Sequence, residues 1–162
     1  MFDLSMFDLV NLPPNMVTHF EPTDDFLGWF ADHVAERFTI EVGAGQCKFS
    51  KALIQLGAKV LAVEPRPAPE VLKECSNFLL SLPIERVRIV RNPGIVVVVA
   101  RPDHSGWFSD LADMVSPESE LIYIGLEKNF DLDIPEHFRT DELYREAGLD
   151  GEVVLRVRRS DA

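Results

Sequence analysis

The sequence predicts an α/β fold, a three-layer sandwich in which helices cover both faces of a mostly parallel central sheet. Two observations predict it. Residues 38–63 read as strand, glycine turn, helix and strand, and a unit of this kind is almost always right-handed and parallel. Residues 95–100, IVVVVA, have the length and composition of a strand that is buried on both faces. We therefore expect these strands to meet in the middle of the sheet.

Each element of the first unit has its own signal. The strand at 38–42 is mostly apolar. From Phe49 onward, apolar residues recur at i, i+3, i+4 and i+7, which is one face of a helix, and Gly57 suits the position just after its end. Residues 59–63, KVLAV, supply the second strand, which ends at Glu64 before a proline.

The turn between the first strand and its helix contains two glycines, Gly43 and Gly45. Glycine accepts unusual backbone angles and has no Cβ, so a ligand can lie directly against the main chain. A dinucleotide-binding turn places a third glycine three residues after the second, and that position is Lys48 here. The bulk of the lysine makes NAD or FAD the less expected ligand.

Acidic residues flank this turn on both strands. Glu41 stands two residues before Gly43, and Glu64 ends the second strand. The arrangement resembles the first motif, E/D-x-G-x-G-x-G, of the S-adenosylmethionine (SAM)-dependent methyltransferases with a Rossmann-like fold. The chain matches that motif at Glu41, Gly43 and Gly45 and departs from it at Cys47, where the third glycine would be.

This resemblance, which extends over residues 37–127, implies SAM as the cofactor. Glu41 would organise the amino-acid end of SAM through the glycine loop, and Glu64 would accept both ribose hydroxyls, as a carboxylate can from a cis-diol. Arg101, besides a role in cofactor binding, could bind an anionic substrate or form an ion pair with Glu127. The alternative to a cofactor-binding unit is a βαβ unit whose glycines only make a tight turn. The expected cofactor-binding residues are Glu41, Gly43, Ala44, Gly45, Gln46, Glu64, Pro65 and Arg101.

The candidate catalytic residues follow the strand at 95–100, in the segment RPDHSGW. Ligands of open α/β sheets bind at the carboxyl ends of the strands, so this segment should lie at the site. His104 is the candidate general base, because an imidazole titrates near neutral pH, and Asp103 is the second candidate. A lone histidine in a loop could equally be structural or solvated.

The remaining elements are expected as follows. Helices should begin after a cap at Thr23 or Asp24, at Pro69 (ending at Pro83), after a cap at Ser105 or Asp103, and at 140–147, with strands at 121–126 and 153–157. The resembled family ends with an antiparallel pair of strands, and only one is evident here. The sheet could therefore be truncated, and an unpaired last strand would then be a plausible homodimer edge.

Residues 86–90 alternate basic and apolar side chains, as in an edge strand. Only four residues separate them from the strand at 95–100, whereas parallel neighbours need a crossover of about a dozen residues. Either the intervening helix has been lost, or residues 86–90 are not a strand of the sheet, or the two segments form a hairpin.

At 162 residues the chain has room for one domain. We expect residues 1–22 to form an N-terminal segment or lid, and residues 23–162 to form a single methyltransferase-like domain. No apolar run approaches the ~20 residues of a membrane span, so the expected location is cytoplasmic. The spacing of Cys47 and Cys75 predicts no metal site. Cys75 should be a core residue, and Cys47 could be a reactive thiol at a helix N-terminus.

The net charge of −11 argues against nucleic acid as a partner. Six arginines nevertheless gather at 86–91 and 156–159, either as a local basic patch or as decoration that protects edge strands. The sequence is therefore interpreted as a SAM-dependent methyltransferase that acts on a small molecule or a protein side chain. The alternative is a noncatalytic SAM-sensing or protein-interaction module, and an NAD-dependent enzyme is a distant third.

Overall fold

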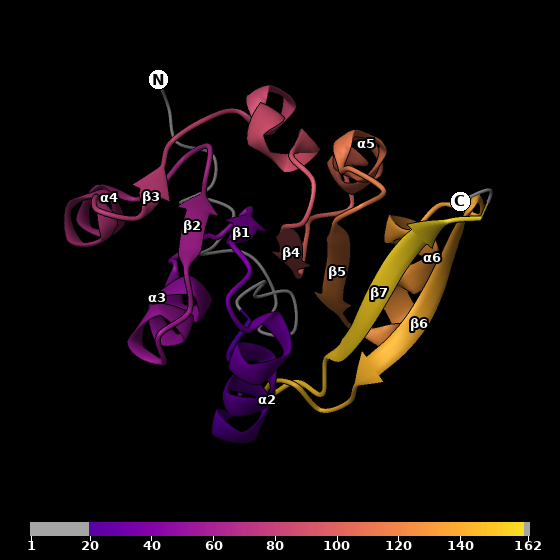
Figure 1. Cartoon of the computed structure of the whole chain (residues 1–162), viewed down its shortest axis with the longest axis horizontal. Helices are drawn as coiled ribbons and strands as arrows, with labels where there is room; N and C mark the ends of the chain where they lie inside the picture. Colours follow the sequence, from indigo (N-terminus) through magenta and orange to yellow (C-terminus); the bar gives the residue numbers. More distant parts are fainter. Residues whose placement is uncertain (1–19, 161–162) are drawn as a thin grey trace, which may run out of the picture.

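The computed structural model describes residues 20–160, which fold around one seven-stranded sheet (Figure 1). Its strands are β1 (Thr39–Val42), β2 (Val60–Val63), β3 (Leu79–Leu80), β4 (Val96–Ala100), β5 (Glu120–Gly125), β6 (Phe138–Tyr144) and β7 (Val153–Arg159). They lie in the order β3-β2-β1-β4-β5-β7-β6. Strands β1 to β5 are parallel, and β7 is antiparallel to both of its neighbours. The predicted α/β fold with a mostly parallel sheet is confirmed.

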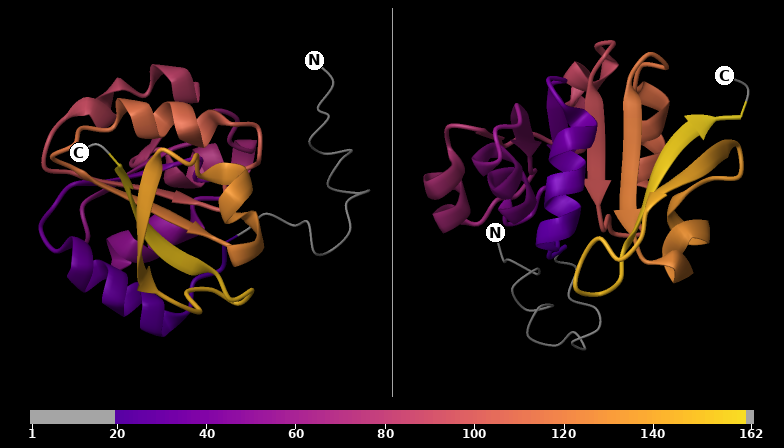
Figure 2. Two further views of the ribbon diagram at one scale, coloured as in Figure 1. Left: turned by 90° about the vertical axis from the view of Figure 1, so that its right-hand side faces the viewer. Right: turned by 60° about the horizontal axis from the view of Figure 1, so that its bottom comes forward.

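Helices cover both faces of this sheet (Figure 2). Helices α2 (Asp24–Val34) and α3 (Lys48–Gln55) pack on one face, where Phe26, Phe30 and Phe49 meet Val96 and Val98. Helix α5 (Trp107–Met114) covers the other face together with residues 84–91. Successive residues of β4 point to opposite faces of the sheet, and all of them are buried. This central strand is therefore covered on both faces, which explains its unbroken aliphatic sequence.

Residues 86–90 are not a strand. They belong to two 3-10 helices, η2 (Ile84–Arg86) and η3 (Arg88–Arg91), which lie against α5. Of the three alternatives for this segment, the second is therefore correct. The strand that follows β2 in the sequence is instead the short β3. It lies inside the segment that was predicted to be helical from Pro69 to Pro83, because helix α4 (Pro69–Cys75) already ends at Cys75.

Both antiparallel strands, β6 and β7, are present at the C-terminal end of the sheet, so the expectation of only one such strand was wrong and the sheet is not truncated there. The first five residues of the segment predicted as a helix at 140–147 belong instead to strand β6, in which exposed and half-buried side chains predominate. It pairs with β7, and β7 also pairs with β5. The last strand therefore has two neighbours and offers no free edge for a dimer. A short helix, α6 (Phe130–Asp133), and the 3-10 helix η4 (Glu127–Asn129) connect β5 to β6.

Two of the predicted helix caps can be compared with the structure. Thr23 caps α2, because its side chain accepts a hydrogen bond from the amide of Phe26 at 3.2 Å. The cap of α5 is Gly106, and neither predicted residue caps this helix. Asp103 instead accepts hydrogen bonds from the amide and hydroxyl of Ser105, at 3.0 and 2.5 Å, which closes a local turn before the helix.

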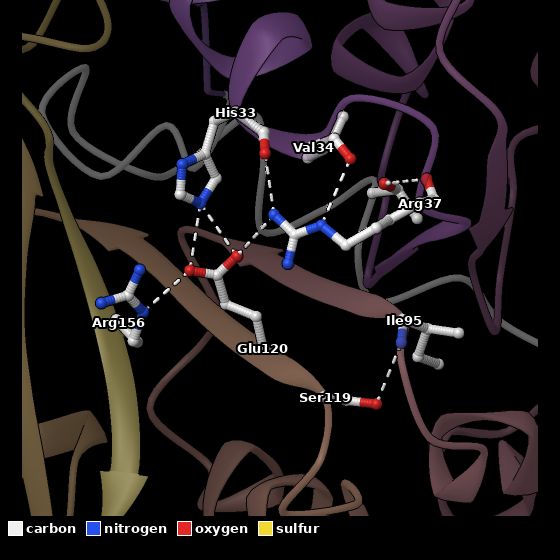
Figure 3. Close-up of polar contacts among 8 residues, drawn as sticks. His33, Val34, Arg37, Ile95, Ser119, Glu120 and Arg156 are labelled. Carbon is white, nitrogen blue, oxygen red and sulfur yellow. Dashed lines mark hydrogen bonds and ion pairs between the residues drawn. The ribbon is translucent and has the colours of Figure 1, made fainter.

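A buried carboxylate ties α2 to the sheet at the end where β5 begins (Figure 3). Glu120 contacts His33 Nε2 at 2.8 Å, Arg37 Nη2 at 3.0 Å and Arg156 Nε at 2.8 Å. Burial alone would raise the pKa of Glu120, but the hydrogen bond from Arg156 and the interactions with His33 outweigh it and lower the pKa below its ordinary value. The carboxylate therefore stays ionised and joins α2, β5 and β7.

The predicted N-terminal lid, residues 1–22, lies outside the described residues except for its last three. Phe20 is buried against Phe26 and Phe49, and Pro22 forms an antiparallel bridge with Gly148. Among residues 20–160, no helix has the length and apolar character needed to cross a membrane.

Candidate cofactor and active site

A pocket with a volume of about 520 Å³ lies at the carboxyl ends of β1, β2 and β4. This is the edge where parallel α/β sheets bind their ligands. All eight predicted cofactor-binding residues line the pocket, and so does Asp103. Phe20, Lys48, Phe49, Arg66, Ile84, Ala100, Pro102 and Trp107 complete its wall.

The glycine loop requires its unusual backbone. Gly43 and Gly45 have φ angles of 75° and 57°, in the left-handed region that favours glycine. A Cβ on Gly43 would lie 3.1 Å from the ring of Trp107, so the missing side chain also lets α5 approach the loop. Cys47, which stands where the resembled motif has a third glycine, likewise adopts a left-handed φ of 63°. The loop therefore has a left-handed backbone at three positions, of which two are glycines and the third is Cys47.

Glu64 connects the glycine loop to the end of β2. Its Oε1 accepts a hydrogen bond from the amide of Gly45 at 2.8 Å, and its Oε2 accepts one from the amide of Arg66 at 3.0 Å. Each carboxylate oxygen has two lone pairs, so both can still accept a further hydrogen bond. The carboxylate is thus held at the pocket wall with the capacity that a ribose diol requires.

Glu41 is buried beneath the same loop. Its Oε1 accepts a hydrogen bond from the hydroxyl of Ser50 at 2.6 Å. Burial raises the pKa of Glu41 to about 7, against the opposing effect of the Ser50 hydrogen bond. Glu41 therefore exchanges a proton near neutral pH while it supports the turn from below.

We predict that Glu41→Gln removes a pH dependence of stability. In the unfolded chain Glu41 titrates near 4.5, whereas in the folded protein it titrates near 7. The folded state therefore holds a proton that the unfolded state has lost, and stability falls as the pH rises through this range. Between pH 5 and 8 the wild type should lose about 2 kcal/mol that E41Q does not lose. Urea unfolding measures this, with exposed Glu136→Gln as the control. Parallel pH profiles for wild type and E41Q would refute it.

His104 is held by a buried carboxylate. Its Nδ1 lies 2.6 Å from Oδ1 of Asp133, whose Oδ2 accepts a hydrogen bond from the hydroxyl of Tyr123 at 2.5 Å. The side chain of Asp133 is only 2% exposed, whereas that of His104 is 45% exposed. Burial, followed by the hydrogen bond to Asp133, raises the pKa of Tyr123, which keeps its proton on the hydroxyl. With Nδ1 engaged, Nε2 is the imidazole nitrogen left to face solvent.

The two predicted catalytic residues occupy different places. Asp103 lines the pocket, whereas His104, although adjacent in sequence, does not. A substrate that reacts with SAM near Asp103 would have to extend toward Nε2 of His104 if the imidazole is to accept its proton.

Arg101 lines the pocket but turns its guanidinium toward the loop between β6 and β7. Its Nη1 lies 2.8 Å from Asp150 and 3.5 Å from Glu152. The predicted alternative of a pair with Glu127 was wrong, because Glu127 pairs with Arg145 instead. Burial raises the pKa of Glu152, an effect that the Arg101 charge counteracts.

The sequence allowed Cys47 to be a reactive thiol, but its surroundings in the structure make it unreactive. It is fully buried, and burial together with the negative charge of Glu41 raises its pKa to about 12. Because only the thiolate is a good nucleophile, Cys47 is unreactive at neutral pH. Cys75 packs in the same buried cluster, as predicted. Among residues 20–160, no group of three or more His, Cys, Asp or Glu side chains is placed to hold a metal ion.

No protein-family model and no curated protein sequence matches this chain, but many solved structures do. Magnesium protoporphyrin IX methyltransferase from Synechocystis, solved with bound SAM, has a TM-score of 0.59 at 15% identity, covering 85% of this chain and 77% of that chain. For N-methyltransferase NodS from Bradyrhizobium japonicum, the values are 0.56 at 12% identity, with 83% and 92% covered. The fold is the Rossmann-like fold of SAM-dependent methyltransferases. Its parallel strands are followed by β6 and β7, which Figure 1 shows side by side and running in opposite directions.

A third structure with this methyltransferase fold was solved with S-adenosylhomocysteine and a substrate. It is 1,6-didemethyltoxoflavin-N1-methyltransferase from Burkholderia thailandensis, with a TM-score of 0.57 at 14% identity, covering 98% of this chain and 84% of that chain. At this level of identity the likeness establishes the fold alone.

Sequence reasoning missed several residues of this methyltransferase-fold site. Ser50 was not singled out, although it directly follows an expected helix-face residue, and its contact with Glu41 depends on how α3 packs on β1. Asp133 and Tyr123 are 29 and 19 residues from His104 in sequence, so no local pattern links them to it. A search for carboxylates beyond the end of β5 could have identified Asp133 as a candidate.

Proposed function

We propose that this chain binds SAM and transfers its methyl group to a small molecule or a protein side chain. The observation that carries the proposal is the position of Glu64, whose two oxygens are both anchored to backbone amides at the pocket wall and both retain accepting capacity. A pocket of about 520 Å³ is of the size that holds a cofactor. The bound SAM and S-adenosylhomocysteine in two structural neighbours support the choice of ligand.

In this proposal the glycine loop lies against the amino-acid end of SAM, and Glu64 accepts the ribose hydroxyls. Trp107 and Phe20 supply apolar walls. The reactive methyl group of SAM supplies the chemistry, and the protein aligns the acceptor with it. His104, oriented by Asp133, would accept the proton that a hydroxyl or amine acceptor loses, and Asp103 is the second candidate for that role.

A specific prediction tests the role of His104. His104→Ala should lower kcat for methyl transfer by about 100-fold or more, because a positioned base contributes roughly that factor, while SAM affinity is unchanged. Tritiated SAM with the protein and small-molecule fractions of an extract of the source cells provides the assay. His137, an exposed histidine outside the pocket, gives the matched control His137→Ala. Equal activity of the two variants would remove His104 from the mechanism.

The second candidate function is a noncatalytic SAM-sensing or protein-interaction module. It is favoured by the position of His104 outside the pocket wall and by the short connection between β5 and β6, where helix α6 has only four residues. In that case SAM binds but no fraction of the extract becomes labelled.

A further inference from the structure

Two basic side chains of the pocket wall have no partner among the described residues. The wall contains three basic residues, Lys48, Arg66 and Arg101. Arg101 is held by Asp150 and Glu152. Lys48 and Arg66 are exposed, and the side chain of neither forms an ion pair or a hydrogen bond with a described residue. The positive charges of these two side chains are therefore available to a ligand in the pocket.

The acidic residues of the same wall have contacts of their own. Glu64 accepts hydrogen bonds from two backbone amides. Asp103 accepts hydrogen bonds from Ser105. Glu41 is buried beneath the glycine loop and accepts a hydrogen bond from Ser50. None of these three carboxyl groups forms an ion pair with a basic side chain among the described residues.

The two available basic residues belong to different parts of the pocket. Arg66 follows Glu64 beyond the end of β2, which is the ribose side of the pocket in the proposed function. Lys48 follows the glycine loop directly and is the first residue of α3. In the proposed function the amino-acid end of SAM lies against that loop. Lys48 is therefore the available basic residue at the end of the pocket where the SAM carboxylate would lie.

Lys48 stands where a positive side chain is unfavourable. The first turn of a helix is the positive end of the helix dipole, so a lysine there is disfavoured. The first turn of α3 contains no acidic residue, and the side chain of Cys47, which precedes the helix, makes no capping hydrogen bond. A carboxylate bound beside Lys48 would offset this local excess of positive charge.

We propose that Lys48 pairs with the carboxylate of SAM and thereby selects ligands that carry the complete amino-acid group. This inference rests on the proposed function. The lysine ammonium is a compact charge on a flexible stem, and a hydrogen bond between two charged groups is among the strongest in proteins. Lys48 also stands where a dinucleotide-binding turn has its third glycine. The residue that departs from the dinucleotide pattern is thus one that recognises SAM.

The test compares two ligands that differ only in the carboxylate, SAM and decarboxylated SAM, by isothermal titration calorimetry with the full chain. Wild type should bind SAM about 10-fold or more tightly than decarboxylated SAM, as expected for a charge-assisted hydrogen bond. In Lys48→Met this ratio should fall to about threefold or less, while the affinity for decarboxylated SAM is not weakened. Lys48→Arg keeps the charge and should retain most of the selectivity.

Lys51→Met is the matched control. Lys51 is exposed on the same helix but does not line the pocket, so this variant removes the same charge without removing the proposed contact. The ratio of the two affinities should stay within about twofold of the wild-type value, because an exposed charge away from the ligand is screened by salt. Circular dichroism verifies that each variant is folded.

Two results would overturn this inference and leave the proposed function standing. In the first, K48M binds SAM with the selectivity of the wild type. In the second, K48M weakens the binding of SAM and of decarboxylated SAM by the same factor, so that Lys48 acts on the pocket without contacting the carboxylate. A folded wild-type protein that binds neither ligand is a different outcome, because it overturns the proposed function and this inference with it.

Discussion

Replacing Glu64 with alanine should weaken SAM binding by about 100-fold or more. Under the proposed function, the substitution removes the two charge-assisted hydrogen bonds that Glu64 would accept from the ribose hydroxyls, each worth about 1.5–3 kcal/mol. It also frees the amides of Gly45 and Arg66 from the carboxylate that holds them, so the glycine loop loses its connection to the end of β2. Isothermal titration calorimetry of wild type and E64A measures the effect.

The control for this experiment is Glu136→Ala, which removes an equal charge from an exposed position outside the pocket. Its SAM affinity should stay within about twofold of wild type, as expected for a distant surface charge. If E64A binds SAM as tightly as E136A does, Glu64 does not hold the ribose, and the proposed orientation of the cofactor is wrong.

Replacing Arg101 with alanine should destabilise the fold by about 3 kcal/mol, because loss of one partner leaves a buried charge uncompensated. The Arg101 side chain is 9% exposed, and that of Glu152 is fully buried. The loss of stability caused by R101A should grow as the pH rises. The pKa of Glu152 is already raised by burial, so in R101A the carboxyl must either stay protonated or ionise without a counter-charge. Urea unfolding at pH 5 and pH 8 tests both parts.

Two further variants identify the cause of the Arg101 effect. R101A combined with Glu152→Gln should recover about half of the lost stability, because the buried charge is gone. Arg145→Ala breaks an exposed pair with Glu127 and Glu142 and should cost less than about 1 kcal/mol. An R101A protein that is as stable as R145A would mean that the pair with Glu152 contributes nothing to the fold.

The elements that were predictable from sequence are those whose pattern is local. The turn at Gly43 and Gly45, with the strand before it and the helix after it, has a signature within about 25 residues. Thr23 as a cap and the buried run of β4 belong to the same class. For this reason all the predicted cofactor-binding residues line one pocket.

The elements that failed are those decided by tertiary contacts. The segment at 140–147 contains good helix formers, yet its first five residues lie in β6, because β7 offers it a partner along most of its length. Residues 86–90 alternate like a strand but lie in η2 and η3, because α5 buries Val87 and Val90 against the sheet. The contact of His104 with Asp133 likewise depends on where α6 is placed.

The most direct test of the central claim is a calorimetric titration of the purified chain with SAM and S-adenosylhomocysteine, with NADH and ATP as controls. The account predicts saturable binding of both adenosyl ligands at one site per chain, and no comparable binding of NADH or ATP. If the folded protein shows no heat of binding with SAM, or binds NADH instead, the assignment of the pocket to SAM is contradicted.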